Sequence, residues 1–284
     1  RAFYKAVSFT SFYELINIQD NRFMQFMHPV LFNIGPLAVH TYGVFVALGF
    51  LAGLALTVWL GRSEGIAPGR VIDMGIVILI AALAGSRLLY VFLNLSFYLK
   101  EPMAVFRLWE GGLVFSGGIV AALAVMAFFL RRHGLSFWKT GDMWAPGIAL
   151  GQAVGRVGCL MAGCCYGLPA YQIPWAVVFT DPACLAPTGI PLHPAQIYSA
   201  LSGLAVSATV LAVFFRKKYD GQALVWFVIL HSTARLVIER FRWDDRGAVF
   251  GSGMTVTQLV TLTILAAAVT TIFFKKNRAG GNGK

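Results

Sequence analysis

The chain has 284 residues, of which 58% are hydrophobic and 12% are charged, and its formal net charge at pH 7 is +11. Together with a mean hydropathy of +0.71, this composition excludes an ordinary soluble domain and indicates a polytopic membrane protein. Such a charge would suggest nucleic-acid binding in a soluble chain. In a membrane protein it is better explained by topology, so we expect no nucleic-acid partner.

Apolar segments long enough to cross a bilayer recur along the sequence. A membrane-spanning helix needs about 20 apolar residues, and about seven segments meet this condition. They lie at roughly 36–60, 71–98, 111–130, 144–162, 194–215, 222–242 and 253–274. The predicted fold is therefore an all-α polytopic membrane protein with about seven transmembrane helices and a small irregular outer loop region.

The predicted domain organisation follows from these segments. Residues 1–27 are interpreted as an N-terminal extension or upstream sequence, because they lack the apolar core of a signal peptide. Residues 28–275 form one transmembrane domain that includes an outer loop at 162–193, and residues 276–284 form a basic tail. Lysine and arginine gather in alternate loops, which predicts a cytoplasmic C-terminus and an N-terminus outside.

Polar residues in the first two spans are the first candidates for a site. His40 and Tyr42 lie near the outer end of the first span, where single aromatic residues commonly act as interfacial anchors. Arg87 lies in the middle of the second span and must find an anion or carbonyl dipoles there. Its function is either to bind an anionic ligand or to fix helix packing through an ion pair with Glu110 or Asp142.

Two pairs of glycines lie at the outer end of the third span. Gly111 and Gly112 form one pair, Gly117 and Gly118 form the other, and Ser116 lies between them. Paired glycines allow backbone N–H groups to approach an anionic group. Close packing between helices is the competing explanation.

The segment 144–167 carries an arginine well inside an apolar stretch. Arg156 is costly at that depth and is therefore a candidate functional residue, although its side chain could instead extend to the membrane surface. Small residues recur at multiples of four, at Gly147, Gly151, Gly155, Cys159 and Gly163. Such spacing predicts a helix face on which a neighbour packs closely.

Four cysteines, Cys159, Cys164, Cys165 and Cys184, lie in or next to the outer loop. The leading expectation is a disulfide from Cys184 to Cys164 or Cys165, because disulfides persist outside the membrane. The alternative is that Cys159 or Cys165 remains a free thiol in the site. Their Cys-x4-Cys-Cys spacing differs from structural zinc motifs, so no metal is expected.

The sixth predicted span contains a polar stripe. His231, Arg235, Glu239 and Arg242 share one face of a helix with 3.6 residues per turn. At membrane depth that face must meet the interior of the bundle or a wet cavity. Guanidinium groups in such a cavity suit the phosphate of a phospholipid whose tails stay in the bilayer.

Six motifs in order resemble those of the bacterial prolipoprotein diacylglyceryl transferases: HTYG, SRLLYVF, WEGGLVFSGG, GRVGCLMAGCCYG, HPAQIY and RLVIERFR. The resemblance extends from about residue 29 to the last span. It implies an enzyme of the bacterial inner membrane that uses phosphatidylglycerol. The diacylglyceryl group of this lipid would move to the lipobox cysteine thiol of a preprolipoprotein and form a thioether. Neither a metal nor a soluble cofactor would take part.

The resemblance also implies a set of site residues. The expected catalytic residues are Arg156, Arg235, Glu239 and His231, and the two arginines would hold the phosphate that leaves. The expected substrate-binding residues are Tyr42, His40, Arg87, Gly111, Gly112, Ser116, Gly117, Gly118 and Cys159.

Some positions depart from the family pattern. Ser116 stands where well-studied members have a histidine, Cys159 replaces an asparagine, and Ser199 replaces a glutamate. Ala162 and Cys164 replace a later asparagine and glutamate. Because serine is a poor base, we expect Arg156 and Arg235 to favour the acceptor thiolate, with help from His231. A paralogue with another acceptor and a non-catalytic phospholipid-binding protein are the alternatives.

Overall fold

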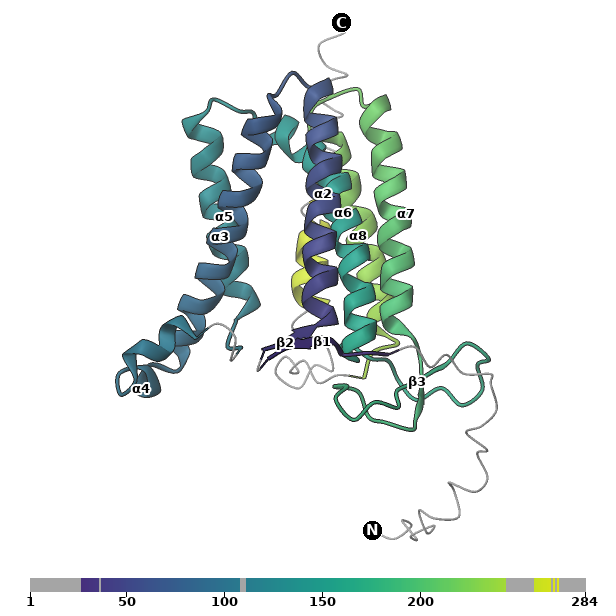
Figure 1. Cartoon of the computed structure of the whole chain (residues 1–284). Coiled ribbons are helices and arrows are strands. Elements are labelled where there is room, and N and C mark those ends of the chain that lie inside the picture. Colours follow the sequence, from purple (N-terminus) through teal and green to yellow (C-terminus); the bar gives the residue numbers. More distant parts are fainter. Residues whose placement is uncertain are drawn as a thin grey trace, which may run out of the picture. The chain divides into compact units, whose positions relative to one another are not determined.

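The computed structural model describes residues 27–35, 37–107 and 111–243, and residues 258–270 in part (Figure 1). The chain divides into two compact units. Unit 1 comprises residues 1–49, 151–205 and 228–284, and unit 2 comprises residues 50–150 and 206–227. The boundaries between the units fall inside four of the long helices.

Helices make up most of the described chain. They are α2 (Thr41–Ser63), α3 (Pro68–Leu93), α4 (Leu95–Tyr98), the 3-10 helix η1 (Pro102–Phe106), α5 (Phe115–Arg132), α6 (Phe137–Ala162), α7 (Ala195–Arg216) and α8 (Gln222–Glu239). Two small antiparallel sheets accompany them. One pairs β1 (Val30–Ile34) with β2 (Leu37–His40), and the other pairs β3 (Val177–Val178) with β4 (Pro191–Leu192).

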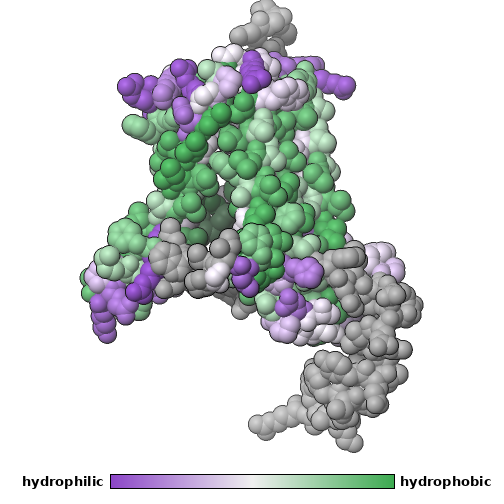
Figure 2. Space-filling model, in the orientation of Figure 1, coloured by the Kyte–Doolittle hydropathy of each residue, from purple (hydrophilic) through white to green (hydrophobic). Residues whose placement is uncertain are grey.

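The helices confirm a polytopic membrane protein. Within the described residues, five helices, α2, α3, α5, α7 and α8, are long and apolar enough to span a membrane. Helix α6 is as long as α3, but Gln152 and Arg156 make it less apolar. Of the predicted span at 253–274, residues 258–266, 268 and 270 are described and are helical, and the others lie outside the described residues. On the face in Figure 2, hydrophobic residues cover the helices and hydrophilic residues gather near the helix ends.

Several predicted boundaries are wrong. Helix α6 begins at Phe137 and not at residue 144. Residues 37–40 form strand β2 instead of the start of a helix, since Thr41 begins α2 and its backbone N–H donates to the Pro29 carbonyl at 2.9 Å. The second span ends at Leu93, after which Asn94 separates α3 from α4. The third span begins at Phe115, because the preceding glycines have positive φ angles that helices do not contain.

In unit 2, α3 and α5 lie side by side, and small residues allow their backbones to approach (Figure 1). A Cβ atom at Gly117 would collide with the carbonyl of Gly85, and one at Gly118 would lie 2.9 Å from the carbonyl of Ala82. Membrane helices associate through such close packing, because lipid supplies no hydrophobic drive between them.

At the basic end of unit 2, an ion-pair network joins the first turns of α6 to the segments that follow α2 and α7. Lys217 Nζ lies 2.7 Å from a carboxylate oxygen of Glu64 and 3.2 Å from one of Asp142, and Lys139 lies 3.1 Å from Glu64. The buried Asp142 also accepts hydrogen bonds from the backbone N–H groups of Gly221 and Leu224. The network therefore fixes the ends of α2, α6 and α7 within this unit.

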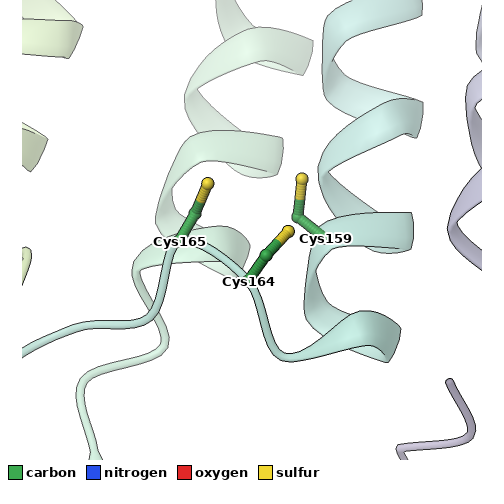
Figure 3. A group of neighbouring side chains, drawn as sticks. All are labelled: Cys159, Cys164 and Cys165. Atoms are coloured by element: carbon green, nitrogen blue, oxygen red, sulfur yellow. The ribbon is translucent and has the colours of Figure 1, made fainter. Parts of the chain in front are cut away.

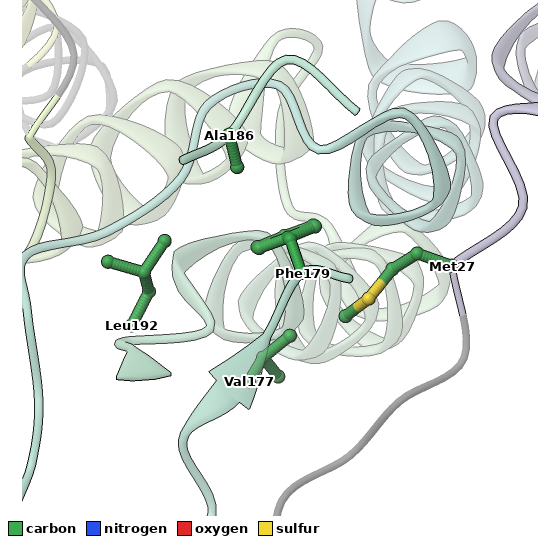
Figure 4. Close-up of a cluster of buried hydrophobic side chains, with 5 residues drawn as sticks. All are labelled: Met27, Val177, Phe179, Ala186 and Leu192. Carbon is green, nitrogen blue, oxygen red and sulfur yellow. The ribbon is translucent and has the colours of Figure 1, made fainter. Parts of the chain in front are cut away.

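In unit 1, the outer loop has its own small core (Figure 4). Met27, Val177, Phe179, Ala186 and Leu192 are all buried and pack together. Val177 belongs to strand β3, which lies within the sequence WAVVF. Met27, the last residue of the predicted N-terminal extension, packs against the loop.

Glycines on α6 contact α2 through backbone atoms, as the spacing predicted. In unit 1, a Cβ atom at Gly49 would lie 2.5 Å from the carbonyl oxygen of Gly151. In unit 2, a Cβ atom at Gly147 would lie 2.5 Å from the carbonyl oxygen of Gly53. Gly155 differs, because its Cβ atom would meet nothing within 4 Å.

Candidate active site

The candidate site in unit 1 is centred on Arg156, in the last part of α6. Arg156 is partly buried and is close enough to interact electrostatically with Tyr42, Cys159 and His231. Gly158 allows the start of α2 to approach α6, since its Cβ atom would lie 3.1 Å from the carbonyl oxygen of Tyr42. The structure therefore gathers four of the predicted site residues, from α2, α6 and α8.

Helix α8 contributes a close ion pair to the same unit. Arg235 Nη2 lies 2.7 Å from a carboxylate oxygen of Glu239, and the two side chains are only 16% and 4% exposed. The pair joins residues i and i+4, as the predicted stripe requires. Glu239 thus orients Arg235 and neutralises its charge at a depth where an unpaired charge is costly.

Arg242 does not lie on the predicted helical stripe. Helix α8 ends at Glu239, and Arg242 instead pairs its backbone with Gly167 in an isolated antiparallel bridge. Its buried side chain interacts with the thiol of Cys165. The stripe prediction extended the helix too far, because the apolar and basic residues 240–242 carry no helix-stop signal.

All four cysteines are free thiols, so the predicted disulfide from Cys184 to Cys164 or Cys165 is wrong. The thiol of Cys184 donates a hydrogen bond to the carbonyl of Met161, with 4.0 Å between sulfur and oxygen. The other three form a cluster, in which the sulfur atoms of Cys159, Cys164 and Cys165 all lie within 4.8 Å of one another (Figure 3).

The cluster polarises its own thiols. Hydrogen bonding with Cys159 and Cys165, together with burial, raises the pKa of Cys164. Hydrogen bonding from Cys159 and Cys164 lowers the pKa of Cys165 despite its burial, and the Arg242 guanidinium lowers it further. Of the two loop thiols, Cys165 is therefore the one that carries negative charge more readily.

Arg87, in unit 2, binds backbone carbonyls. Its Nε donates to Val105 at 2.9 Å, Nη1 donates to Gly111 and Gly112 at 2.7 and 3.2 Å, and Nη2 donates to Ala104 and Arg107 at 2.6 and 3.1 Å. All five donors of the guanidinium are thus used. The ion pair with Asp142 does not form, and Glu110 lies outside the described residues.

The glycine pairs serve the same region of unit 2. Gly111 and Gly112 have φ angles of +84° and +75°, and a Cβ atom at Gly112 would lie 2.6 Å from Arg87 Nη1. Gly117 and Gly118 lie in the first turn of α5 and pack against α3. These contacts favour the packing explanation over an anion site for both pairs.

A pocket of about 280 Å³ in unit 2 is lined by Arg87, Tyr90, Asn94, Phe97, Tyr98, Gly111 and Gly112. Tyr90 and Tyr98 present their rings to the Arg87 guanidinium at 5.9 and 5.5 Å. Two other predicted binding residues are exposed: Ser116 at the start of α5, and His40 at the end of β2.

Sequence reasoning missed Cys164, Cys165 and Arg242 as members of one cluster. The sequence did hold a signal, because glycine is the residue that most often ends a helix and Gly163 stands between Cys159 and Cys164. In the structure Gly163 has a φ angle of +70°, follows the end of α6 and turns the chain back. Such a turn carries the following cysteines toward the last turn of the helix, where Cys159 lies.

These helices and side chains define a multi-pass membrane protein with an arginine-containing site suited to an anionic lipid. A family model described as prolipoprotein diacylglyceryl transferase matches residues 29–274. The chain is similar to the phosphatidylglycerol–prolipoprotein diacylglyceryl transferase of Clostridium tetani, with 31% identity over 236 residues, 83% of this chain and 93% of that protein. A transferase of the same name from Solidesulfovibrio magneticus is 33% identical over 248 residues, 84% of this chain and 90% of that protein.

The chain therefore belongs to the prolipoprotein diacylglyceryl transferase family, as the six motifs indicated. A third relative with that name, from Bordetella parapertussis, is 31% identical over 245 residues. The match covers 92% of that protein, which is nearly its whole length.

Proposed function

We propose that this protein transfers the diacylglyceryl group of phosphatidylglycerol to the lipobox cysteine thiol of preprolipoproteins, forming a thioether. Family membership across residues 29–274 supports the reaction, and the names of the relatives support both substrates. The structural observation that carries the proposal is the ion pair of the partly buried Arg235 with the buried Glu239, in the same unit as Arg156.

The arginines would act on the phosphate of the lipid. Breaking the C–O bond between glycerol and phosphate leaves negative charge on a phosphate oxygen. Guanidinium groups held in place before the reaction stabilise that charge where water is excluded. Arg235 is suited to this function because Glu239 fixes its position without consuming all of its donors.

The nucleophile belongs to the acceptor protein. A thiol attacks as its thiolate, so the site must favour loss of the thiol proton. Arg156 would supply a favourable electrostatic field, and His231, which interacts with Arg156, would assist in removing the proton. Tyr42 lies beside both Arg156 and the cysteine cluster, where it would contact the substrates.

The reaction fits a protein of the bacterial inner membrane. The basic segments around Arg70, Arg131 and Lys217 would face the cytoplasm under the positive-inside rule. The outer loop and the cysteine cluster would then face the opposite side, where the lipobox cysteine of an exported protein is presented.

Mass spectrometry of a lipobox peptide incubated with the purified protein and phosphatidylglycerol tests this function. We expect a diacylglyceryl mass on the cysteine with wild type, and at least about a 100-fold lower rate with Arg235→Ala. Arg240→Ala is the matched control, because Arg240 is exposed five residues further along and should leave the rate within about twofold.

Two outcomes would contradict the proposal. Equal rates in the Arg235→Ala and Arg240→Ala variants would remove Arg235 from the reaction. A folded wild-type protein that binds phosphatidylglycerol but never modifies the peptide would indicate a lipid-binding protein or a different acceptor.

A further inference from the structure

The cluster of Cys159, Cys164 and Cys165 takes no part in the transfer proposed above. Cys159 lies in the last turn of α6 and is buried, whereas Cys164 and Cys165 lie in the loop that follows and are partly exposed (Figure 3). The three sulfur atoms all lie within 4.8 Å of one another. Free thiols that lie so close together can be joined by a disulfide when an oxidant reaches one of them.

Backbone contacts hold the three cysteines in this arrangement. The N–H of Cys164 donates to the carbonyl of Cys159 at 3.1 Å, and Gln196 Nε2 donates to the carbonyl of Cys164 at 2.9 Å. Cys165 has a φ angle of +61°, the one positive φ of a residue other than glycine within the described part of the chain. Such a conformation persists only where its surroundings hold it, and it is commonly found at functional sites.

The loop that carries Cys165 is tied to the chain after α8, and this connection brings a cation to the cluster. The N–H of Leu168 donates to the carbonyl of Phe241 at 2.8 Å, and Gly167 bridges to Arg242. The guanidinium of Arg242 interacts with the thiol of Cys165. A partly exposed thiol beside a cation is typical of a reactive cysteine.

Cys165 is the thiol that an oxidant attacks first. Hydrogen bonds from Cys159 and Cys164 lower the pKa of Cys165, and the Arg242 guanidinium lowers it further. Hydrogen bonding raises the pKa of Cys164, and burial raises the pKa of Cys184. Because the thiolate is the reactive form of cysteine, Cys164 and Cys184 react more slowly.

Cys159 is the thiol that completes the disulfide. A disulfide between the adjacent residues Cys164 and Cys165 would close a small ring and distort the peptide bond between them, which is costly. Cys159 is not adjacent to Cys165, and its sulfur approaches from within 4.8 Å to a bond length of about 2.05 Å. Rotation of the two side chains about their Cα–Cβ bonds moves the sulfur atoms by distances of this size.

We propose that Cys165 and Cys159 are a redox-active pair, in which hydrogen peroxide oxidises Cys165 and Cys159 then closes a reversible disulfide. The thiolate of Cys165 attacks the peroxide, the O–O bond breaks, and a sulfenic acid forms while hydroxide leaves. The thiol of Cys159 attacks the sulfenic sulfur, an S–S bond forms, and water leaves. The two sulfur atoms are oxidised and the peroxide oxygens are reduced. A dithiol restores both thiols by exchange.

The disulfide also affects the candidate active site, because the cluster borders it. Cys159 interacts electrostatically with Arg156 on the same helix, and Tyr42 interacts with Arg156 and with all three cysteines. Drawing Cys159 toward Cys165 therefore changes the surroundings of Arg156. We expect transfer to slow by at least about tenfold, since small displacements of catalytic groups are costly. This effect rests on the proposed transferase function, whereas the disulfide does not.

Disulfide formation is tested on the purified full-length protein without lipid or peptide. After treatment with hydrogen peroxide, the remaining thiols are alkylated and the disulfides are mapped by mass spectrometry. We expect Cys159 joined to Cys165 in wild type, and no disulfide in Cys165→Ser. In Cys159→Ser, the sulfenic-acid reagent dimedone should label Cys165. Cys184→Ser is the matched control, because Cys184 is a partly exposed thiol of the same loop, and it should behave as wild type does. No disulfide in wild type, or one that joins other cysteines, would overturn the proposal.

The effect on transfer is measured after catalase has destroyed the peroxide, so that the acceptor peptide stays reduced. Oxidised wild type should be slow and should recover with dithiothreitol, whereas peroxide-treated Cys165→Ser should stay within about twofold of its own untreated rate. An unchanged rate in fully oxidised wild type would refute the effect on the site and leave the redox pair standing. Absence of transfer by the reduced protein, with the disulfide still formed on oxidation, would refute the proposed transferase function instead.

Discussion

At the scale of single residues, Arg87 and Arg235 represent two solutions for an arginine inside a membrane protein. Arg87 directs all five donors to carbonyl oxygens of its own unit. Arg235 is paired with one carboxylate, which leaves other donors for a ligand. The sequence predicted both arginines as site residues, because hydrogen bonds to backbone carbonyls do not depend on side-chain type and so leave no pattern in the sequence.

Arg87→Lys distinguishes structural from functional use of Arg87. An ammonium group keeps the charge but has three donors and cannot reproduce the planar fork, so several carbonyls lose their partners. We expect unit 2 to be destabilised by about 2–4 kcal/mol, with the KM for phosphatidylglycerol unchanged. Thermal unfolding in detergent and transfer kinetics provide the measurements.

Arg107→Lys is the control for that variant, because Arg107 contributes its backbone carbonyl, which the substitution retains, and its side chain is 44% exposed. A raised KM in Arg87→Lys without loss of stability would contradict the structural function.

Glu64 lies outside the membrane spans, and its protonation makes the stability of the protein depend on pH. Burial alone would raise the pKa of Glu64, but hydrogen bonds and charges from Lys217 and Lys139 outweigh it and lower the pKa below the ordinary 4.5. A lowered folded-state pKa contributes stability above the unfolded pKa, and that stability is lost as pH falls through the folded value.

We therefore expect the unfolding temperature in detergent to fall below about pH 4.5 in wild type, and to fall less in Glu64→Gln. Glu101→Gln, which changes a carboxylate that is 55% exposed, should follow the wild-type curve. Parallel pH curves for wild type and Glu64→Gln would contradict this assignment.

At the scale of secondary-structure elements, helix positions were predicted more closely than helix ends. The fifth predicted span at 194–215 became α7 at Ala195–Arg216, because a continuous apolar run bounded by Pro194 and basic residues defines it clearly. The first and third predicted spans included residues that form β2 and a glycine turn. Both segments are apolar and lie next to a membrane helix. Their composition shows that they are hydrophobic, but it does not show whether the backbone is a helix, a strand or a turn.

The contact of α6 with α2 is the element-level feature that a substitution can test. Gly49→Ala would place a methyl group 2.5 Å from the carbonyl oxygen of Gly151. Because the methyl carbon is fixed by the backbone of α2 and the oxygen belongs to the backbone of α6, neither can move easily. Overpacking of this kind costs about 1–3 kcal/mol, which should appear as a lower unfolding temperature.

Gly155→Ala is the matched control, since its new methyl group meets nothing within 4 Å and alanine favours helix. We expect this variant to be as stable as wild type or more so. A destabilised Gly155→Ala together with an unaffected Gly49→Ala would show that the glycine spacing serves another purpose.

At the scale of the whole molecule, the fold class and family follow from the sequence, whereas the site follows only in part. Hydropathy predicted the fold class and six ordered motifs predicted the family, and both predictions were confirmed. The clustering of Cys159, Cys164 and Cys165 depends on a turn at Gly163, and the position of Arg242 depends on where α8 ends. Long-range contacts of this kind are decided by tertiary structure and not by residue spacing.

Membrane orientation is the whole-molecule property that remains a prediction. The positive-inside rule places the loop at Gly134 in the cytoplasm and the loop at Leu185 outside. Alkaline phosphatase fused after Leu185 should be active, and the same enzyme fused after Gly134 should be inactive. The reverse pattern would refute the predicted orientation and the outer position of the cysteine cluster.

The hydrogen bonds of Arg87 also have a consequence for how the protein is made. An arginine within a membrane-spanning helix is costly, and Arg87 lies six residues before the end of α3 at Leu93. All five of its carbonyl partners lie between residues 104 and 112, in the segment that connects α3 to α5. The segment that satisfies the charge is therefore synthesised next, before α5. Helix α3, its loop and α5 can consequently enter the bilayer as a helical hairpin, without waiting for the C-terminal half of the chain.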